Sequence, residues 1–391
     1  MKRILIIALA LCLSTCLATG RESRQDKAFG WATIASIQGG EYQLCGGGDS
    51  GRTVVLKSNG RDMREDIKKA IRNNDIIVFD GSQGEFIISK AIDIKDIKNK
   101  TLKGVNNAII RTEFSTNKEI VAILDSLNVK NMSSSGGGGT LINGQKVKEE
   151  REFNTRKALI EYTGDLSESL RSAGLFKISA CENLIIRNIA FQGPGPIDVS
   201  GADLISLGGG SHHIWVDHCC FADGMDGNLD ITDGSDFITI SYCIFRYTEK
   251  AYDHKASNLI SSRKEADKID NYNITFAYCI WGEGCNLRMP IARYGTIHLF
   301  NNYYNCAGNQ NPAISAKAES EFLIENNYFA PGVSKIFKAD SDAKAWNFKG
   351  NIFSERFSEK DKGSVKVPYK YQLIPAKQVP TLLSSKSGPT L

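Results

Sequence analysis

The chain has 391 residues, of which 41% are hydrophobic, and its formal net charge at pH 7 is +4. With a mean hydropathy of −0.25, it is typical of a folded protein in water that is long enough to bury a large core. The small net charge gives no argument for a nucleic-acid ligand, although it is compatible with a polyanionic one.

The first 20 residues are predicted to be a processing signal. A basic start (1–3) precedes an apolar core (4–13) of secretory length, which is too short to span a membrane. The sequence LSTC that ends at Cys16 is similar to a bacterial lipoprotein box, although threonine is unusual before that cysteine. Cleavage after Ala18 or Gly20 by an ordinary signal peptidase is the alternative. We therefore expect a protein that is exported or held at the bacterial cell envelope by a lipid on Cys16.

The rest of the chain, 21–391, is expected to form one domain with an N-terminal cap. After a glycine-rich stretch, Asp62 is placed to cap a short amphipathic helix in MREDIKKAIR. The polar tail, 355–391, is expected to pack back along the domain. Between them, strand-like runs lie at 75–81, 85–94 and 99–105, and regular coils run from about 174 to 354.

Within these regular coils, short β-rich segments each end in a bulky aromatic residue. The spacing between successive aromatics is 30, 24, 36, 23, 25 and 24 residues. A repeat in this range indicates a solenoid, in which one turn of chain stacks on the next. The aromatics are Phe191, Phe221, Phe245, Trp281, Tyr304, Phe329 and Phe353.

Two positions before each aromatic lies a second column, which is Ile189, Cys219, Cys243, Cys279, Asn302, Asn327 and Asn351. In parallel coils one position recurs about every 4.8 Å, so short polar side chains can hydrogen-bond along the stack at a bend. The pattern predicts an all-β fold, a right-handed single-stranded parallel β-helix. Antiparallel β structure aligned by chance is the alternative. The cysteines after the leader are expected to be mostly free buried thiols.

Three aspartates are candidate ligands for a metal ion. Asp226 and Asp230 follow the Phe221 strand, and Asp203 lies one coil earlier. Stacking would bring the three carboxylates together, where repulsion raises their pKa values unless a cation lies among them. Oxygen-only ligands favour Ca²⁺. The alternative is that they are turn aspartates, which are common between short strands.

Two arginines and one lysine are candidate groups for binding an anion. Arg288 and Arg293 flank Pro290 and could form a rigid anion-binding edge, with surface loop charge as the alternative. Lys250 would lie on the coil between the aspartates and the arginines, although a solvated lysine is the stronger explanation when this residue is taken alone.

A hydrolase relay is also conceivable, because Asp217 and His218 are adjacent and Ser211 or Ser241 could complete a triad. Neighbouring residues of a strand point to opposite faces, however. We therefore expect a structural role for this pair in coil stacking.

The chain resembles the pectate lyases of polysaccharide lyase family one. The resemblance covers about 28–380 and rests on IWVDHCCF, DGNLDITDGSDFITISYCIF, RMPIARYGTIHLFNNYY and NLIIRNIAFQGPG, with AFGWAT and KTLKG nearer the N-terminus. It implies a pectate-lyase-like solenoid. It also implies that Asp203, Asp226 and Asp230 are calcium-binding carboxylates. By the same resemblance, Arg288 is the catalytic arginine, Arg293 a second, substrate-binding arginine and Lys250 a substrate-binding lysine.

Two departures from the family pattern affect the substrate contacts. Thr232 stands where some members have a substrate-contacting lysine. The loop after Lys250 is longer than in compact members, so that His254 or Lys255 could share or take the role of that lysine.

The resemblance implies calcium-dependent β-elimination of polygalacturonate to 4,5-unsaturated oligogalacturonides, with Arg288 taking the C5 proton. An arginine base is neutral mainly at high pH, so we expect an alkaline optimum, and we expect a monomer. One alternative is a polygalacturonase-type hydrolase that recruits Asp223, Asp226 and Asp230. Another is a non-catalytic glycan-binding β-helix. A calcium-free lyase for methylated pectin is disfavoured because the aspartate cluster is complete.

Overall fold

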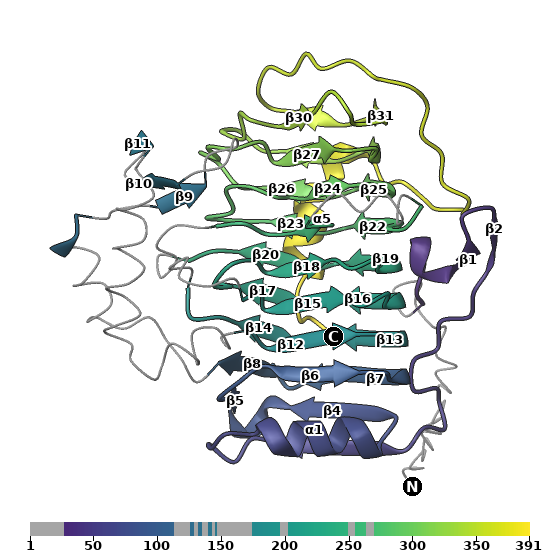
Figure 1. Cartoon of the computed structure of the whole chain (residues 1–391), viewed down its shortest axis with the longest axis vertical. Coiled ribbons are helices and arrows are strands. Elements are labelled where there is room, and N and C mark those ends of the chain that lie inside the picture. The colour runs from purple at the N-terminus through teal and green to yellow at the C-terminus, as the bar shows by residue number, and fades with distance from the viewer. Residues whose placement is uncertain are drawn as a thin grey trace, which may run out of the picture.

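The computed structural model describes residues 27–112, 126–128, 132–134, 140–142, 145–146, 174–195, 202–248, 255–262 and 270–391. Short parallel strands stack there into three long sheets that wrap around one apolar core (Figure 1). The predicted right-handed parallel β-helix is therefore confirmed. The predicted leader, Cys16, Lys250 and His254 lie outside the described residues. None of the described helices is long and apolar enough to cross a membrane.

Sheet 1 faces the viewer in Figure 1 and will carry the candidate site. Its strands, in spatial order, are β6 (Ile92–Lys95), β12 (Phe176–Ser179), β15 (Ile205–Gly208), β18 (Leu229–Ile231), β21 (Leu259–Ile260), β24 (Ile291–Arg293), β27 (Ile314–Lys317) and β30 (Phe337–Ala339).

Sheet 2 follows sheet 1 along each coil. Its strands are β3 (Thr53–Lys57), β4 (Ile76–Asp80), β7 (Lys98–Val105), β13 (Glu182–Arg187), β16 (His212–Asp217), β19 (Asp236–Ser241), β22 (Ile274–Ala277), β25 (Thr296–Phe300), β28 (Glu321–Glu325) and β31 (Ala345–Lys349).

Sheet 3 completes each coil and carries the predicted aromatic column. Its strands are β5 (Phe86–Ile88), β8 (Ile109–Thr112), β14 (Ala190–Gln192), β17 (Cys220–Ala222), β20 (Ile244–Arg246), β23 (Ile280–Trp281), β26 (Tyr303–Tyr304), β29 (Tyr328–Phe329) and β32 (Ile352–Phe353).

The register of sheet 3 is the one predicted from the sequence. Phe191 pairs with Phe221, Phe221 with Phe245 and Phe245 with Trp281, and the column continues through Tyr304 to Phe353. Successive rings stack with centroids 5.2, 5.2, 5.7, 4.7, 4.3 and 5.1 Å apart. Because the rings from Phe191 to Phe329 are buried and Phe353 is partly buried, the column forms one wall of the core.

The polar column lies at the bend between sheets 2 and 3. Asn302 Oδ1 accepts a hydrogen bond from Cys279 N (2.8 Å), and Asn327 Oδ1 accepts one from Asn302 N (2.9 Å). The cysteine thiols in the column are buried and free, and Cys243 Sγ donates to Ser241 O at 3.3 Å. The predicted ladder of amides and unbridged thiols is thus confirmed.

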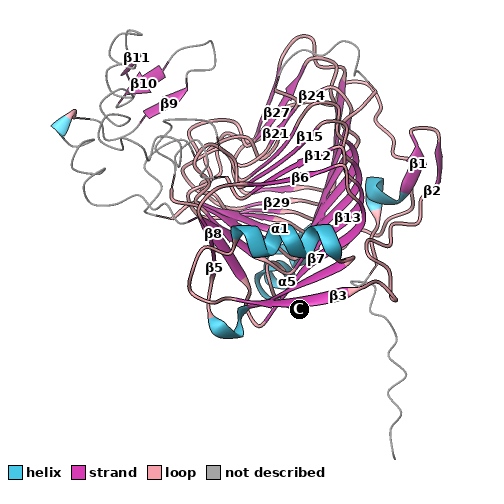
Figure 2. Ribbon diagram, turned by 60° about the horizontal axis from the view of Figure 1, so that its bottom comes forward, coloured by secondary structure: helices cyan, strands magenta, loops and turns pink. Residues whose placement is uncertain are grey.

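The coils begin earlier than the predicted start near 174, because β3 to β8 already occupy sheets 1, 2 and 3. Their sequences were recognisable as strands, but the aromatic column does not extend through β8, where Ile110 pairs with Phe191. Helix α1 (Arg64–Asn73) lies across the end of the solenoid (Figure 2). Asp62 Oδ1 accepts from Arg64 N at 3.0 Å at its start, although the N-cap residue is Met63 and not the predicted Asp62.

The remaining elements are peripheral. Strands β1 (Ile34–Ser36) and β2 (Gly39–Glu41) form an antiparallel pair, and a small antiparallel sheet contains β9, β10 and β11. The bounds of these three strands are Met132–Ser134, Thr140–Ile142 and Gln145–Lys146.

The C-terminal tail runs back along the outside of the coils, as expected. Ile374 N donates to Asn301 Oδ1 at 2.9 Å, and helix α5 (Val379–Lys386) packs with Tyr242. Leu391 N then reaches Asn188 Oδ1 at 3.0 Å. The tail therefore connects coils that are far apart in the sequence.

Candidate active site

Two of the predicted aspartates, Asp203 and Asp226, lie at neighbouring turns that lead into sheet 1, and Asp230 lies in the strand β18. Leu204 N donates to Gly227 O at 3.1 Å, and Asp226 N donates to Ala202 O at 3.2 Å. One coil therefore stacks directly on the next at this point. In the strands that follow, Asp230 of β18 pairs with Ser206 of β15.

Gly227 shows how closely two of the carboxylates approach the same point. A Cβ atom added to this glycine would lie 2.7 Å from Asp203 Oδ1 and 2.9 Å from Asp230 Oδ1. A side chain at this position would collide with both oxygens. The sequence Asp226-Gly227 thus keeps the space between the carboxylates open.

The cluster is electrostatically unfavourable without a cation. Asp230 is buried, and burial is the main reason that its pKa is well above the ordinary range. Repulsion from Asp203 and Asp226 raises the pKa further, while Arg288 and a hydrogen bond from Leu259 N (2.9 Å) lower it. The predicted ligands and the predicted catalytic arginine therefore act on one carboxylate.

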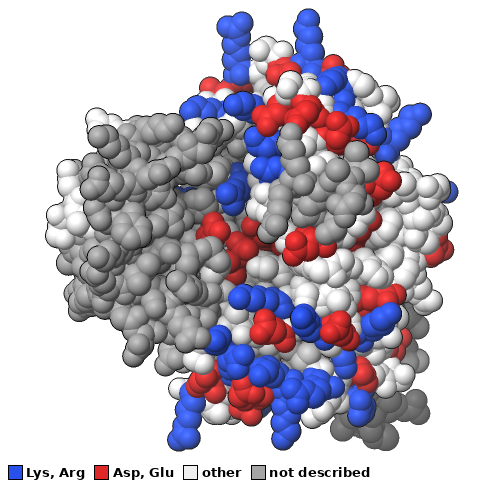
Figure 3. All heavy atoms as spheres, viewed as in Figure 1, with Lys and Arg blue, Asp and Glu red and all other residues white. Residues whose placement is uncertain are grey.

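Acidic side chains gather midway along the face shown in Figure 3, with basic side chains on either side of them. The donor chemistry fits a hard cation such as Ca²⁺, because the three side chains offer only carboxylate oxygens. Across the described part of the chain, however, no group of three His, Cys, Asp or Glu side chains has the geometry to hold a metal ion. The three aspartates therefore lie near one another without forming a closed set of metal ligands.

Arg288 is positioned by an unusual backbone conformation. It is half-buried and has φ = 58°, in the left-handed region that residues with a side chain rarely adopt. Its carbonyl accepts a 2.7 Å hydrogen bond from Asn258 N on the preceding coil. This local turn places Arg288 just before β24 and close enough to Asp230 to lower the pKa of that carboxyl group.

Arg293 ends β24 and is also half-buried. Its Nη1 donates to Ser261 O at 2.8 Å, which leaves the other guanidinium nitrogen atoms for additional interactions. Burial, and then repulsion from Arg288, lower the pKa of Arg293. The two predicted arginines are therefore near neighbours on sheet 1.

Lys250, the predicted substrate-binding lysine, lies outside the described residues, as does His254. Lys255 is described and half-buried, and its carbonyl accepts from Asn286 N at 3.0 Å. The chain after Lys255 therefore leads alongside the segment that carries Arg288. Thr232 is half-buried at the end of β18.

Asp217, His218 and Ser241 do not form the Ser-His-Asp relay that their sequence allowed, as far as the described side chains show. Asp217 and His218 do contact each other, with Nδ1 and Oδ2 2.7 Å apart. The expectation of opposite faces was wrong because His218 has φ = 48°, which turns its side chain out of the strand alternation. Ser241 Oγ donates to Asp217 at 2.6 Å, and Arg187 Nε does so at 2.8 Å. The group is a buried structural network.

Asp223, which a hydrolase could have recruited, is also structural. It is fully buried, and its two oxygens accept from Thr248 N (2.7 Å), Thr248 Oγ1 (2.8 Å) and Gln192 Nε2 (2.9 Å). A carboxylate that is fully buried, with both oxygens hydrogen-bonded to its neighbours, is not presented to a sugar at the surface.

Sequence reasoning missed the residues that support the site from behind. Ser206 Oγ donates to Asp203 Oδ2 at 3.0 Å, and the Asn258–Leu259 backbone contacts both Arg288 and Asp230. The regular coil repeat was the only feature of the sequence that could have aligned these supporting residues with the site. That repeat is lengthened to 36 residues between Phe245 and Trp281, so that Asn258 could not be aligned.

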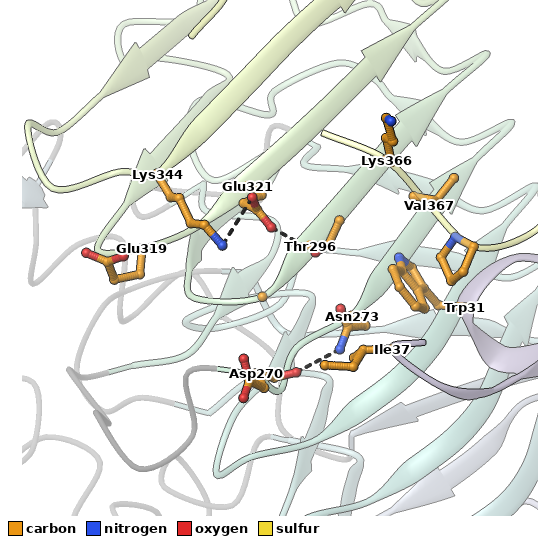
Figure 4. Close-up of a pocket in the computed structure, with 12 residues that line it drawn as sticks. Trp31, Ile37, Asp270, Asn273, Thr296, Glu319, Glu321, Lys344, Lys366 and Val367 are labelled. Carbon is orange, nitrogen blue, oxygen red and sulfur yellow. Dashed lines mark hydrogen bonds and ion pairs between the residues drawn. The ribbon is translucent and has the colours of Figure 1, made fainter. Parts of the chain in front are cut away.

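A separate pocket of about 550 Å³ lies between the N-terminal segment, the turns into sheet 2 and the tail (Figure 4). None of the predicted site residues lines it. Two of its charged side chains form an ion pair, Lys344 Nζ with Glu321 Oε1 at 3.3 Å, and Asn273 Nδ2 donates to Asp270 O at 2.9 Å. The chemistry predicted from the sequence is therefore on sheet 1 and not in this pocket.

Comparison with known proteins places the chain among pectate lyases. The sequence model of a family described as pectate lyase matches residues 113–388. A probable pectate lyase B of Aspergillus terreus is 31% identical over 189 residues, which are 46% of this chain and 54% of that protein. A pectate trisaccharide-lyase of Thermotoga maritima is 37% identical over 136 residues, which are 33% of this chain and 35% of that protein. The chain thus spans about half the length, or less, of these curated relatives.

Solved structures show the same fold. A Bacillus pectate lyase in complex with trigalacturonate has a TM-score of 0.60 and 19% identity, covering 93% of this chain and 98% of that one. The cedar pollen allergen Jun a 1 has a TM-score of 0.59 and 17% identity, covering 93% of each chain. At this level of identity, the likeness concerns the fold alone.

Proposed function

Because the chain belongs to the pectate lyase family, we propose that it is a calcium-dependent pectate lyase that cleaves polygalacturonate by β-elimination. The observation that carries the proposal is that the carboxylates of Asp203 and Asp230 approach the same point beside Gly227, with Arg288 near enough to lower the pKa of Asp230. The trigalacturonate complex of the Bacillus neighbour supports the substrate class.

The aspartates would hold the cation. Asp203, Asp226 and Asp230 supply hard oxygen ligands, and binding would relieve the repulsion that raises the pKa of Asp230. When bound, Ca²⁺ would stabilise the negative charge that develops beside the substrate carboxylate.

Arg288 would act as the base. It takes the C5 proton, the electrons of the C5–H bond form the C4–C5 double bond, and the bond from C4 to the glycosidic oxygen breaks. The leaving oxygen then gains a proton from solvent. The product carries a 4,5-unsaturated uronate end. Because an arginine is neutral mainly at high pH, activity should rise towards alkaline pH.

Arg293 would bind a substrate carboxylate. Its guanidinium group already uses Nη1 to hold Ser261 O, which orients the remaining donors. Lys250 is assigned the same kind of contact from its place in the sequence, with Lys255 or His254 as the alternative. We also propose an exported monomer, either secreted or anchored through Cys16.

The proposal can be separated from hydrolysis by following water. β-Elimination incorporates no water at the cleaved bond, whereas a hydrolase adds one. We expect that cleavage of polygalacturonate in heavy-oxygen water gives unsaturated ends without label. Labelled saturated ends would support the polygalacturonase alternative, although the buried and fully engaged Asp223 argues against it. Absence of cleavage would support a glycan-binding protein.

A further inference from the structure

Asn258 lies behind the site, in the coil between the aspartates and Arg288. Its side chain is fully buried and takes part in two hydrogen bonds to different coils. Nδ2 donates to Leu229 O at 3.0 Å, and Oδ1 accepts from Trp281 Nε1 at 2.9 Å. The amide therefore ties its own backbone to the strand that carries Asp230 on one side and to the core on the other.

The backbone that this amide fixes contacts both halves of the candidate site. Asn258 N donates to Arg288 O at 2.7 Å, and Leu259 N donates to Asp230 Oδ1 at 2.9 Å. Asn258 O also accepts from Ile291 N at 3.1 Å, just after the arginine. Two consecutive peptide groups thus set the distance between the carboxylate and the left-handed turn at Arg288.

We propose that Asn258 is a positioning residue, which holds the Arg288 backbone and the Asp230 carboxylate in register across adjacent coils. The inference rests on the proposed function, because it assigns these two residues to the reaction. Arg288 has a strained φ of 58°, and such a conformation persists when its surroundings fix it. A base that is displaced from its working geometry loses rate more than it loses binding.

The asparagine ladder supplies a matched control. Asn302 is equally buried, donates through Nδ2 to Phe276 O at 2.9 Å and accepts through Oδ1 from Cys279 N at 2.8 Å. Both of these partners lie on the preceding coil, at the bend between sheets 2 and 3 and not beside Asp230 or Arg288. The two substitutions should therefore have comparable effects on stability and different effects on turnover.

The experiment compares Asn258→Ala with Asn302→Ala in the full mature chain. We expect kcat on polygalacturonate to fall about 10–100-fold in Asn258→Ala, with KM within about threefold of wild type. Asn302→Ala should keep kcat within about twofold. Hydrogen exchange provides a readout independent of activity: amides 258 and 259 should exchange at least about tenfold faster in Asn258→Ala only.

If Asn258→Ala does not fold, Asn258→Asp and Asn302→Asp replace the pair, since aspartate keeps the size and the acceptor but loses the donor. Equal losses of kcat in both variants, or unchanged exchange at 258 and 259, would overturn the inference. If the wild type does not cleave polygalacturonate, the proposed function falls. The exchange comparison then still decides whether Asn258 holds this segment.

Discussion

Two polar columns are built by the same stacking of coils, and they differ in how their charges and dipoles meet. At the bend between sheets 2 and 3, Asn302 and Asn327 each accept a backbone hydrogen bond from the preceding coil. At the start of sheet 1, stacking brings Asp203 and Asp226 near Asp230, whose pKa is raised by burial and then by their repulsion. A repeat that places donors against acceptors stabilises the solenoid, whereas one that places like charges together is the feature on which the proposed cation site rests.

The largest effect should come from Arg288, which lies beside the acidic column formed by Asp203, Asp226 and Asp230. We expect Arg288→Lys to lower kcat by about 10²–10⁴-fold, because lysine keeps the charge but lacks the planar guanidinium fork. Calcium binding and thermal stability should stay close to wild type. Turnover is followed by the ultraviolet absorbance of the unsaturated product. Arg246→Lys, at an exposed arginine of sheet 3, is the control. Retention of more than about a tenth of the rate would remove Arg288 from the role of base.

The acidic column itself can be broken by removing one carboxylate. Asp226→Ala and Asp230→Ala should each weaken Ca²⁺ binding at least about tenfold, since each removes a hard oxygen ligand from a shared site. Activity on demethylated substrate should fall in parallel. Titration calorimetry without substrate measures the binding. Asp233→Asn, at an exposed turn of the same coil, should have no effect. Titration curves that overlay the wild type would mean that the aspartates are only turn residues.

Asp236, a carboxylate outside the cluster of Asp203, Asp226 and Asp230, makes the stability of the protein depend on pH. Burial raises the pKa of Asp236 to about 6, although Asn273 N donates to it at 2.7 Å. The folded state then holds this proton more tightly than the unfolded state does. Stability should therefore be greatest below about pH 4 for this group and decline by about 1–3 kcal/mol as pH rises to about 6.

Asp236→Asn should remove that decline. Denaturant unfolding at a series of pH values measures it, and Asp233→Asn is again the exposed control. An unchanged slope between about pH 4 and 6 in Asp236→Asn would show that another group is responsible.

The smallest effect is expected in the ladder. Cys243→Ser should cost about 1–2 kcal/mol through packing and polarity, and the cost should be the same under reducing and oxidising conditions. Activity should not change. Cys45→Ser, at an exposed thiol, should be nearly neutral. A peptide in which Cys219 is cross-linked to Cys243 in the non-reduced protein would contradict the ladder of free thiols.

Much of the scaffold was predictable because its signals are periodic. The aromatic column from Phe191 to Phe353 gave the register of sheet 3, and that register placed Asp203 beside Asp226 and Asp230. The earliest coils were missed as part of the solenoid, since they do not share the full aromatic pattern.

The supporting residues of the site were not predictable for a different reason. The role of Asn258 depends on which carbonyl its amide meets, and this cannot be read from a coil of irregular length. Likewise, the contact between Asp217 and His218 follows from a left-handed backbone at His218 and not from strand alternation. Such features are set by tertiary packing and leave no spacing signal.

The most direct test of the account is a crystal of the wild-type protein soaked in calcium and measured for anomalous scattering. We expect one strong peak bounded by the carboxylates of Asp203, Asp226 and Asp230, within about 2.3–2.6 Å of their oxygens. A crystal of Asp230→Ala serves as the control and should lose that peak. An empty cluster in the wild type at saturating calcium, or a peak bound elsewhere, would contradict the central claim.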